Sequence, residues 1–138
     1  MKFLSELNPE QRAAAEHVDG PLLVIAGAGS GKTRVLTFRI AHLIDHHHVA
    51  PHTIFAVTFT NKAAQEMRER VEKLIGPMGK YVWISTFHSA AVRILRRHAD
   101  RLGYQKSFVI YDDGDQKTLI KKILAEMRIA DKALSPQV

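Results

Sequence analysis

The stretch Ala26-Gly27-Ala28-Gly29-Ser30-Gly31-Lys32-Thr33 is a glycine-rich loop between the apolar run 22–25 and a helical pattern at 33–44. It follows the pattern G-x-x-x-x-G-K-[ST], with the small residue Ala26 in place of the first glycine. A strand before such a loop and a helix after it are the setting in which the pattern binds phosphate. The stretch therefore predicts a site for a nucleoside triphosphate, with an ordinary glycine-rich turn as the alternative.

The chemistry of this loop explains the prediction. Backbone N–H groups from Gly29 to Thr33 can wrap around a phosphate because glycine has no Cβ to obstruct that conformation. The N-terminus of the following helix adds positive potential. We expect the Lys32 ammonium to reach the β- and γ-phosphates and the Thr33 hydroxyl to help hold Mg²⁺. These groups account for nucleotide binding rather than for hydrolysis.

Composition and charge limit the remaining possibilities. A chain of 138 residues with 46% hydrophobic residues can bury one core. It has no cysteine, which excludes disulfides and thiolate zinc sites. We find no signal peptide and no apolar run near the ~20 residues of a membrane span, and so we expect a cytoplasmic protein without membrane contact. The net charge of +6 favours a polyanionic partner, although a basic surface that binds nothing is an alternative.

Short apolar runs alternate with helical patterns, which predicts an α/β fold with a parallel sheet. The predicted strands are residues 22–25, 53–59 and 81–85. The first predicted helix begins at Pro9 with Asn8 as N-cap, and the second follows the glycine-rich loop. The third covers 62–74, with Asn61 as N-cap and Gly76 as its end. The fourth covers 89–102, with Gly103 as its end.

Three further segments carry a family resemblance. They are 8–11 before the first predicted strand, 58–64 at the end of the second, and 85–89 at the end of the third. Together with 26–34 they resemble the N-terminal half of the motor of superfamily 1 helicases of the UvrD/Rep/PcrA type, over residues 7–127. The resemblance implies a P-loop NTPase fold with a RecA-like sheet. Residues 1–106 would form part of domain 1A, and 107–138 would begin the helical inserted domain 1B.

The resemblance also implies roles for the nucleotide-binding residues. Gln11 matches a glutamine that reads adenine, and its carboxamide offers the donor and acceptor that this requires. Arg34 matches an arginine that packs near the base. The alternatives are that Gln11 completes a capping box with Asn8 and that Arg34 is a solvated surface residue. The implied nucleotide site consists of Gln11, Ala26, Gly27, Ala28, Gly29, Ser30, Gly31, Lys32, Thr33 and Arg34.

DNA contacts are implied where the second and third predicted strands end, because the carboxyl ends of parallel strands face the ligand crevice. Phe59 would stack on a base, and polar neighbours would hold the backbone of a single strand. Core packing of Phe59 and a helix-start role for His88 are the alternatives. The implied DNA-binding residues are Phe59, Thr60, Asn61, Thr86, Phe87 and His88.

Three other features have competing interpretations. The arginines at 93, 96, 97 and 101 with His98 suit a solvated helix face as well as phosphate binding. The histidines at 46–48 and 52 suggest a metal site but have no typical ligand spacing. Residues 108–113 look like a Walker B strand, yet they also suit a helix start with Asp113 as N-cap and Gln116 three residues later.

The sequence thus predicts the ATP-binding N-terminal portion of an ATP-dependent 3′–5′ DNA helicase or single-strand translocase of repair or replication. Its expected ligands are ATP, Mg²⁺ and single-stranded DNA, and its expected partner is the remainder of the helicase chain. The resemblance places the family's Asp-Glu motif and second motor domain beyond Val138, and so we expect no unwinding by these residues alone. The alternatives are a nucleotide-dependent module that binds single-stranded DNA and a small P-loop kinase.

Overall fold

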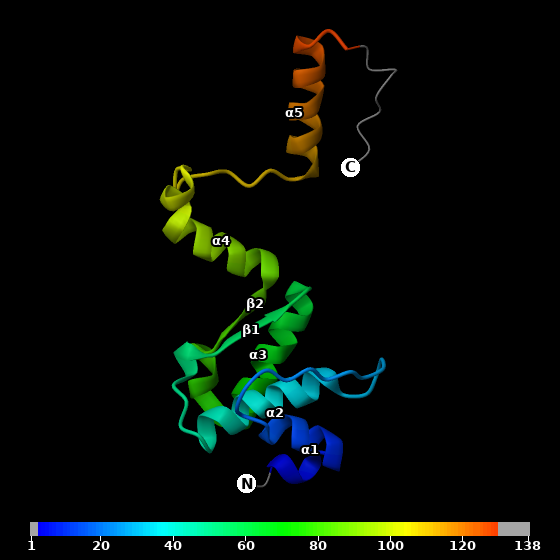
Figure 1. Ribbon diagram of the computed structural model, residues 1–138, viewed down its shortest axis with the longest axis vertical. Coiled ribbons are helices and arrows are strands. Elements are labelled where there is room, and N and C mark those ends of the chain that lie inside the picture. The colour runs from blue at the N-terminus through cyan, green and yellow to red at the C-terminus, as the bar shows by residue number, and fades with distance from the viewer. Residues whose placement is uncertain (1–2, 130–138) are drawn as a thin grey trace. The chain divides into compact units, whose positions relative to one another are not determined.

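The computed structural model describes residues 3–129 (Figure 1). The described part divides into two units at the junction of Arg93 and Ile94, and each unit is described by itself. In chain order the elements, with η for 3₁₀ helices, are η1 (Phe3–Glu6), α1 (Pro9–Glu16), α2 (Lys32–Asp45), η2 (Pro51–Thr53), β1 (Phe55–Thr58), α3 (Asn61–Ile75), η3 (Gly76–Tyr81), β2 (Trp83–Thr86), α4 (Phe87–His98), η4 (Ala99–Leu102) and α5 (Asp113–Glu126).

The first unit is built around a two-stranded parallel sheet. Its register pairs Phe55 with Trp83 at one end and Thr58 with Thr86 at the other. Helix α3 packs against both strands, and α2 packs against α3 (Figure 1). The core between them consists of Ile40, Ile44, Ala64, Met67, Val71, Val82 and Ile84. This mixed helix and strand architecture agrees with the predicted α/β class and with parallel pairing.

A second apolar cluster holds the N-terminal segment in place. Leu4 and Leu7 are buried together with Ala15 of α1 and Phe38 of α2. The edge of the Phe3 ring contacts the Phe38 ring, with 5.9 Å between their centroids. Because this cluster joins η1 and α1 to α2, the segment that carries Gln11 lies beside the helix that follows the glycine-rich loop.

The predicted strands need three corrections. The second and third predicted strands are shorter than expected, Phe55–Thr58 and Trp83–Thr86. Residues 22–25 form no strand, since no ladder in the described part of the chain includes them. Leu23 and Ile25 are 84% and 90% exposed. A strand requires a hydrogen-bonded neighbour, and an apolar run cannot supply one by itself.

Helix boundaries follow their caps. Asn8 caps α1 as predicted, with Pro9 in the first turn. Helix α3 is capped by Thr60, not by Asn61 as expected, because the Ala63 N–H donates to Thr60 Oγ1 at 3.1 Å. Helix α4 begins at Phe87, two residues earlier than expected. The predicted end of α3 at Gly76 is confirmed, with φ of 72°. Helix α4 ends at His98, four residues earlier than expected, and Gly103, with φ of 79°, ends the 3₁₀ helix η4 that follows it.

The second unit contains the last residues of α4, then η4 and α5. Residues 108–111 form no strand there. Asp112, not Asp113, is the N-cap of α5, and it forms a capping box with Asp115 instead of Gln116. The acidic segment therefore starts a helix and is not a Walker B strand. The helix start is the predicted alternative, and its cap lies one residue earlier than predicted. None of the helices in residues 3–129 has both the length and the apolar character needed to cross a bilayer.

Candidate functional site

The glycine-rich loop is folded back on the side chain of Lys32. Lys32 is the first residue of α2, and its Nζ donates to the carbonyl oxygens of Ala26 at 3.0 Å and Gly27 at 2.6 Å. Ser30 Oγ also donates to the Gly27 carbonyl, at 2.7 Å. Two loop carbonyls thus contact an exposed cation at a helix N-terminus, where the helix dipole favours bound anions.

Gly31 is required at the junction of loop and helix. It is the N-cap of α2 with φ of 87°, a left-handed conformation that costs other residues free energy. A Cβ at this position would lie 2.8 Å from Gln11 Nε2. The left-handed conformation therefore selects glycine, whereas the Gln11 amide ends a flexible side chain that could move aside. Thr33, the predicted Mg²⁺ ligand, follows in the first turn of α2 and is half-buried.

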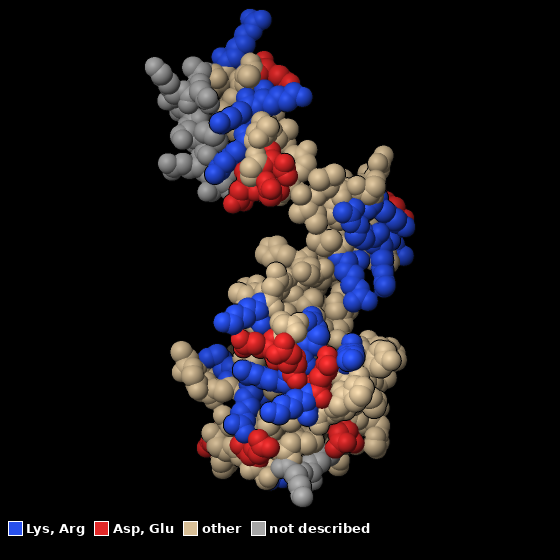
Figure 2. Space-filling model, turned by 180° about the vertical axis from the view of Figure 1, so that it is seen from behind, with Lys and Arg blue, Asp and Glu red and all other residues tan. Residues whose placement is uncertain are grey.

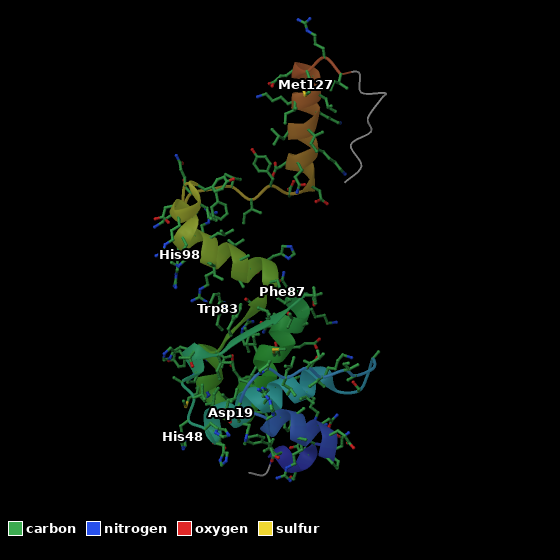
Figure 3. The ribbon with its side chains drawn as sticks, viewed as in Figure 1. Asp19, His48, Trp83, Phe87, His98 and Met127 are labelled. Atoms are coloured by element: carbon green, nitrogen blue, oxygen red, sulfur yellow. The ribbon has the colours of Figure 1, made fainter. Side chains whose placement is uncertain are left out.

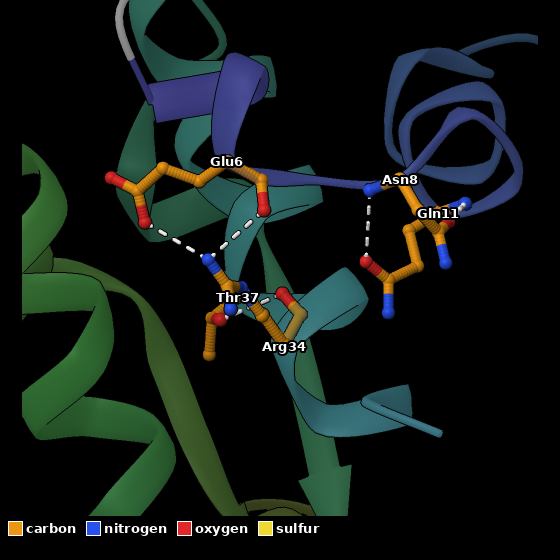
Figure 4. Close-up of polar contacts among 5 residues, drawn as sticks. All are labelled: Glu6, Asn8, Gln11, Arg34 and Thr37. Carbon is orange, nitrogen blue, oxygen red and sulfur yellow. Dashed lines mark hydrogen bonds and ion pairs between the residues drawn. The ribbon is translucent and has the colours of Figure 1, made fainter.

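Gln11 contacts this loop and also caps α1. Its Oε1 accepts from the Asn8 N–H at 3.2 Å, which completes the capping box with Asn8 Oδ1 (Figure 4). Its Nε2 donates to the Ser30 carbonyl at 2.9 Å. The alternative role of Gln11, completion of the capping box, is therefore confirmed. The same side chain also contacts Ser30, 19 residues further along the chain.

Arg34 is held by a partner that sequence reasoning missed. Its Nη2 donates to the backbone carbonyl of Glu6 at 3.1 Å and pairs with Glu6 Oε2 at 2.9 Å (Figure 4). The guanidinium carbon also lies 5.2 Å from the centre of the Phe38 ring. The two partners are 28 residues apart, and no local pattern in the sequence connects them. The alternative expectation for Arg34 is a solvated surface residue. Its side chain is indeed 45% exposed, but it is paired with Glu6.

A second group of predicted residues meets where β1 and β2 end. Phe59 follows β1 and is 88% exposed, and Phe87 follows β2 and is 51% exposed. Their ring centroids are 5.3 Å apart. Figure 3 marks Phe87 at the start of α4. Phe59 is therefore not a core residue, and the two rings form an exposed aromatic pair at the carboxyl edge of the sheet.

The polar residues beside these rings differ in their exposure to solvent. Asn61 and His88 are exposed in the first turns of α3 and α4. Thr60 Oγ1 caps α3. Thr86 is buried at 6% exposure, and its Oγ1 accepts from the Ser89 N–H at 3.2 Å and donates to Ser89 Oγ at 2.9 Å. Both threonine hydroxyls thus serve as helix caps, while their DNA contacts stay predictions.

Comparison with known proteins places this geometry in a family. The model of the UvrD/REP helicase N-terminal domain matches residues 7–137. The chain belongs to this family. This result confirms the resemblance seen in the sequence.

The relatives of this UvrD/REP-type domain are long proteins. The chain is 57% identical over 136 residues to the ATP-dependent DNA helicase PcrA of Bacillus subtilis strain 168. It is 53% identical over 136 residues to the protein of the same name from Staphylococcus aureus strain NCTC 8325. These matches cover 99% of the chain but only 18% and 19% of the two relatives. The chain thus spans about a fifth of the length of the curated relatives it matches.

Three histidine rings gather at the C-terminal end of α2 in this UvrD/REP-type domain. The centroids of His42, His46 and His47 lie 4.8 to 5.0 Å apart. His42 is buried, and its Nδ1 has no hydrogen-bond partner. Burial, with help from His47 and His46, lowers the pKa of His42. Within residues 3–129, no three His, Asp or Glu side chains are arranged to hold a metal ion.

The arginines of α4 divide between ring contacts and solvent. In the first unit, Arg93 lies over the Trp83 ring at 4.5 Å. In the second unit, Arg96 lies over Phe108 at 4.1 Å and donates to the Lys106 carbonyl at 2.7 Å. Figure 2 shows basic side chains gathered on this second-unit segment, where Arg97 and Arg101 are also exposed. The solvated-face and phosphate-binding interpretations of these arginines both stay open.

Proposed function

We propose that this chain is the ATP-binding N-terminal portion of an ATP-dependent DNA helicase that moves 3′ to 5′ on single-stranded DNA. The observation that carries the proposal is the loop at 26–33, which contacts the exposed Lys32 ammonium at the N-terminus of α2 and is contacted by Gln11. Family membership supports it, because the relatives are named as ATP-dependent DNA helicases. We assign residues 1–106 to a partial RecA-like domain 1A and 107–138 to the start of domain 1B.

In this proposal the loop binds the phosphates of ATP. The triphosphate replaces the carbonyl oxygens of Ala26 and Gly27 as the partner of Lys32. An ammonium forms stronger hydrogen bonds with phosphate than with a neutral carbonyl because both partners are charged. The Thr33 hydroxyl helps to hold Mg²⁺, and Gln11 and Arg34 contact the adenine. The binding energy thus comes from charge, the helix dipole and exposed backbone N–H groups.

Single-stranded DNA crosses the carboxyl edge of the sheet. The exposed pair Phe59 and Phe87 offers ring surfaces to bases of any identity. Asn61 and His88 lie beside the rings at the N-termini of α3 and α4, where positive potential favours the phosphate backbone. The arrangement suits a translocase, which must bind DNA independently of sequence.

Movement along DNA needs more than these residues. Helicase motors couple hydrolysis to motion when two domains close on the nucleotide. We therefore expect the 138 residues alone to bind ATP and not to unwind DNA. The remainder of the helicase chain is the partner that completes the motor.

The proposal is tested by measuring ATP binding by the chain and its Lys32→Ala variant. Loss of a charged hydrogen-bonding group predicts a roughly 10- to 100-fold weaker affinity. Lys80→Ala removes the same charge from an exposed site in η3 and should bind ATP normally. Equal affinities for Lys32→Ala and the unchanged chain would refute the nucleotide site.

Hydrolysis assays with and without oligo-dT separate the alternatives. Binding without hydrolysis supports an incomplete motor. Hydrolysis that DNA stimulates and Lys32 requires would favour a self-sufficient nucleotide-dependent module. Release of ADP that depends on a small acceptor, and not on DNA, would favour a kinase.

A further inference from the structure

The contact between Glu6 and Arg34 links the N-terminal turn to the helix behind the glycine-rich loop. Arg34 Nη2 forms both bonds, one to the backbone carbonyl and one to the carboxylate of Glu6. A guanidinium has five N–H donors in one plane, and so the donors on Nε and Nη1 are not consumed by Glu6. The pair therefore fixes the guanidinium without using up its hydrogen-bonding capacity.

Glu6 is held in place because Leu4 and Leu7 of the same turn are buried. It is the last residue of η1, and Leu4 and Leu7 on either side of it are only 4% and 8% exposed. The Leu7 N–H donates to the Leu4 carbonyl at 3.2 Å, which closes the turn. The carbonyl and carboxylate of Glu6 are thus presented from a packed segment and not from a free tail.

The Arg34 guanidinium also lies over the Phe38 ring. The guanidinium carbon lies 5.2 Å from the ring centre, within the range of a cation–π contact. Arginine stacks on flat π systems through both of its faces. The Arg34 side chain is 45% exposed although it contacts Phe38 and Glu6, and so solvent-borne planar ligands such as a nucleobase can reach it.

The arginine would have room to turn away if Glu6 were absent. Glu6, Arg34 and Phe38 line a groove of about 570 Å³ between η1, α2 and α3, together with Thr37, Arg70, Lys73 and Leu74. The side chains of Arg34 and Glu6 are 45% and 59% exposed. Packing alone does not hold the guanidinium, and the ion pair supplies the missing restraint.

We propose that Glu6 is a positioning residue that orients Arg34 toward the base of the bound nucleotide. This inference rests on the proposed ATP site. Glu6 and Gln11 belong to one short segment on either side of the cap Asn8, and Gln11 contacts Ser30 in the loop. The segment 6–11 therefore places both base-directed side chains, Gln11 directly and Arg34 through Glu6.

The test compares ATP with inorganic tripolyphosphate, which offers the phosphates without a base. Glu6→Gln keeps the size of the side chain and the backbone carbonyl but removes the charge. Exposed ion pairs contribute little, and so ATP affinity should fall about two- to fivefold at low salt. Tripolyphosphate affinity should not change. The difference in ATP affinity should shrink in ~0.5 M salt, because salt screens exposed charges.

Two variants make the outcome interpretable. Glu10→Gln removes the same charge from an exposed residue in the first turn of α1 and should leave the affinity for both ligands unchanged. Lys32→Ala should weaken both ligands. If Lys32→Ala lowers the affinity for both ATP and tripolyphosphate while Glu6→Gln binds ATP normally, the positioning role of Glu6 is overturned and the nucleotide site stands. Equal losses for ATP and tripolyphosphate in Glu6→Gln also overturn it, since they indicate a disturbed loop. If Lys32→Ala weakens neither, the ATP site itself is wrong.

Discussion

Replacing Phe59 by alanine should weaken the binding of single-stranded DNA while leaving the fold intact. The ring is 88% exposed at the carboxyl edge of the sheet, and its centroid lies 5.3 Å from that of the Phe87 ring. Few apolar contacts are therefore lost on truncation. Substitutions at exposed sites usually change the free energy of unfolding by no more than about 0.5 kcal/mol.

The expected loss of DNA affinity follows from base stacking. Removal of a stacking ring costs ~1–3 kcal/mol per base, which corresponds to roughly 5- to 150-fold in the dissociation constant. We expect a value in the lower half of this range, because Phe87 stays in place and still offers a ring. The dependence of affinity on salt should not change, since that slope reports phosphate contacts and phenylalanine carries no charge.

The assay is a fluorescence anisotropy titration with labelled oligo-dT at several salt concentrations. Phe55→Ala is the matched control, because Phe55 begins the same strand and pairs with Trp83 at the opposite end of the register. Urea unfolding of both variants shows whether the fold is retained. Phe59→Ala that binds oligo-dT as tightly as the unchanged chain, or a Phe55→Ala variant that loses as much affinity, would refute the stacking role.

Three further predictions concern stability and the loop. Asn8→Ala removes the cap of α1 and should lower the free energy of unfolding by ~1 kcal/mol in a urea titration, whereas an unchanged midpoint would contradict the capping role. Gly31→Ala places a side chain at φ of 87° and displaces the Gln11 amide from its position 2.8 Å away, and so it should weaken ATP binding in the same titration as Lys32→Ala; normal binding would show that the loop can relax. The pKa of His42 is lowered by burial, by His47 and His46 and by Arg39, against an opposing effect of Glu16. The unfolded chain therefore takes up this proton first, and stability that is present above about pH 6.5 should be lost as the pH falls below that value. Unfolding of His42→Leu should depend less on pH in this window, and an identical pH dependence in both proteins would contradict the assignment.

Local features of the site were predictable because their causes are local. The N-cap at Asn8, the capping box with Gln11, and the helix stop at Gly76 depend on residues a few positions apart. The placement of Lys32 at the start of α2 follows in the same way from the glycines before it. Errors at Asn61 and Asp113 amount to one residue, because neighbouring polar side chains compete for the same cap.

By itself, the sequence determined the glycine-rich loop, the positions of the main helices and of the two strands that pair, and the family to which the chain belongs. Only the tertiary structure decided that residues 22–25 stay unpaired, that Phe59 meets Phe87, and that Thr86 is buried as a cap. The same is true of Glu6 and Arg34, which lie 28 residues apart. The physical reason is that strand pairing, ring contacts and ion pairs depend on which segments the core brings together. Caps and turns depend on backbone geometry within one turn of chain.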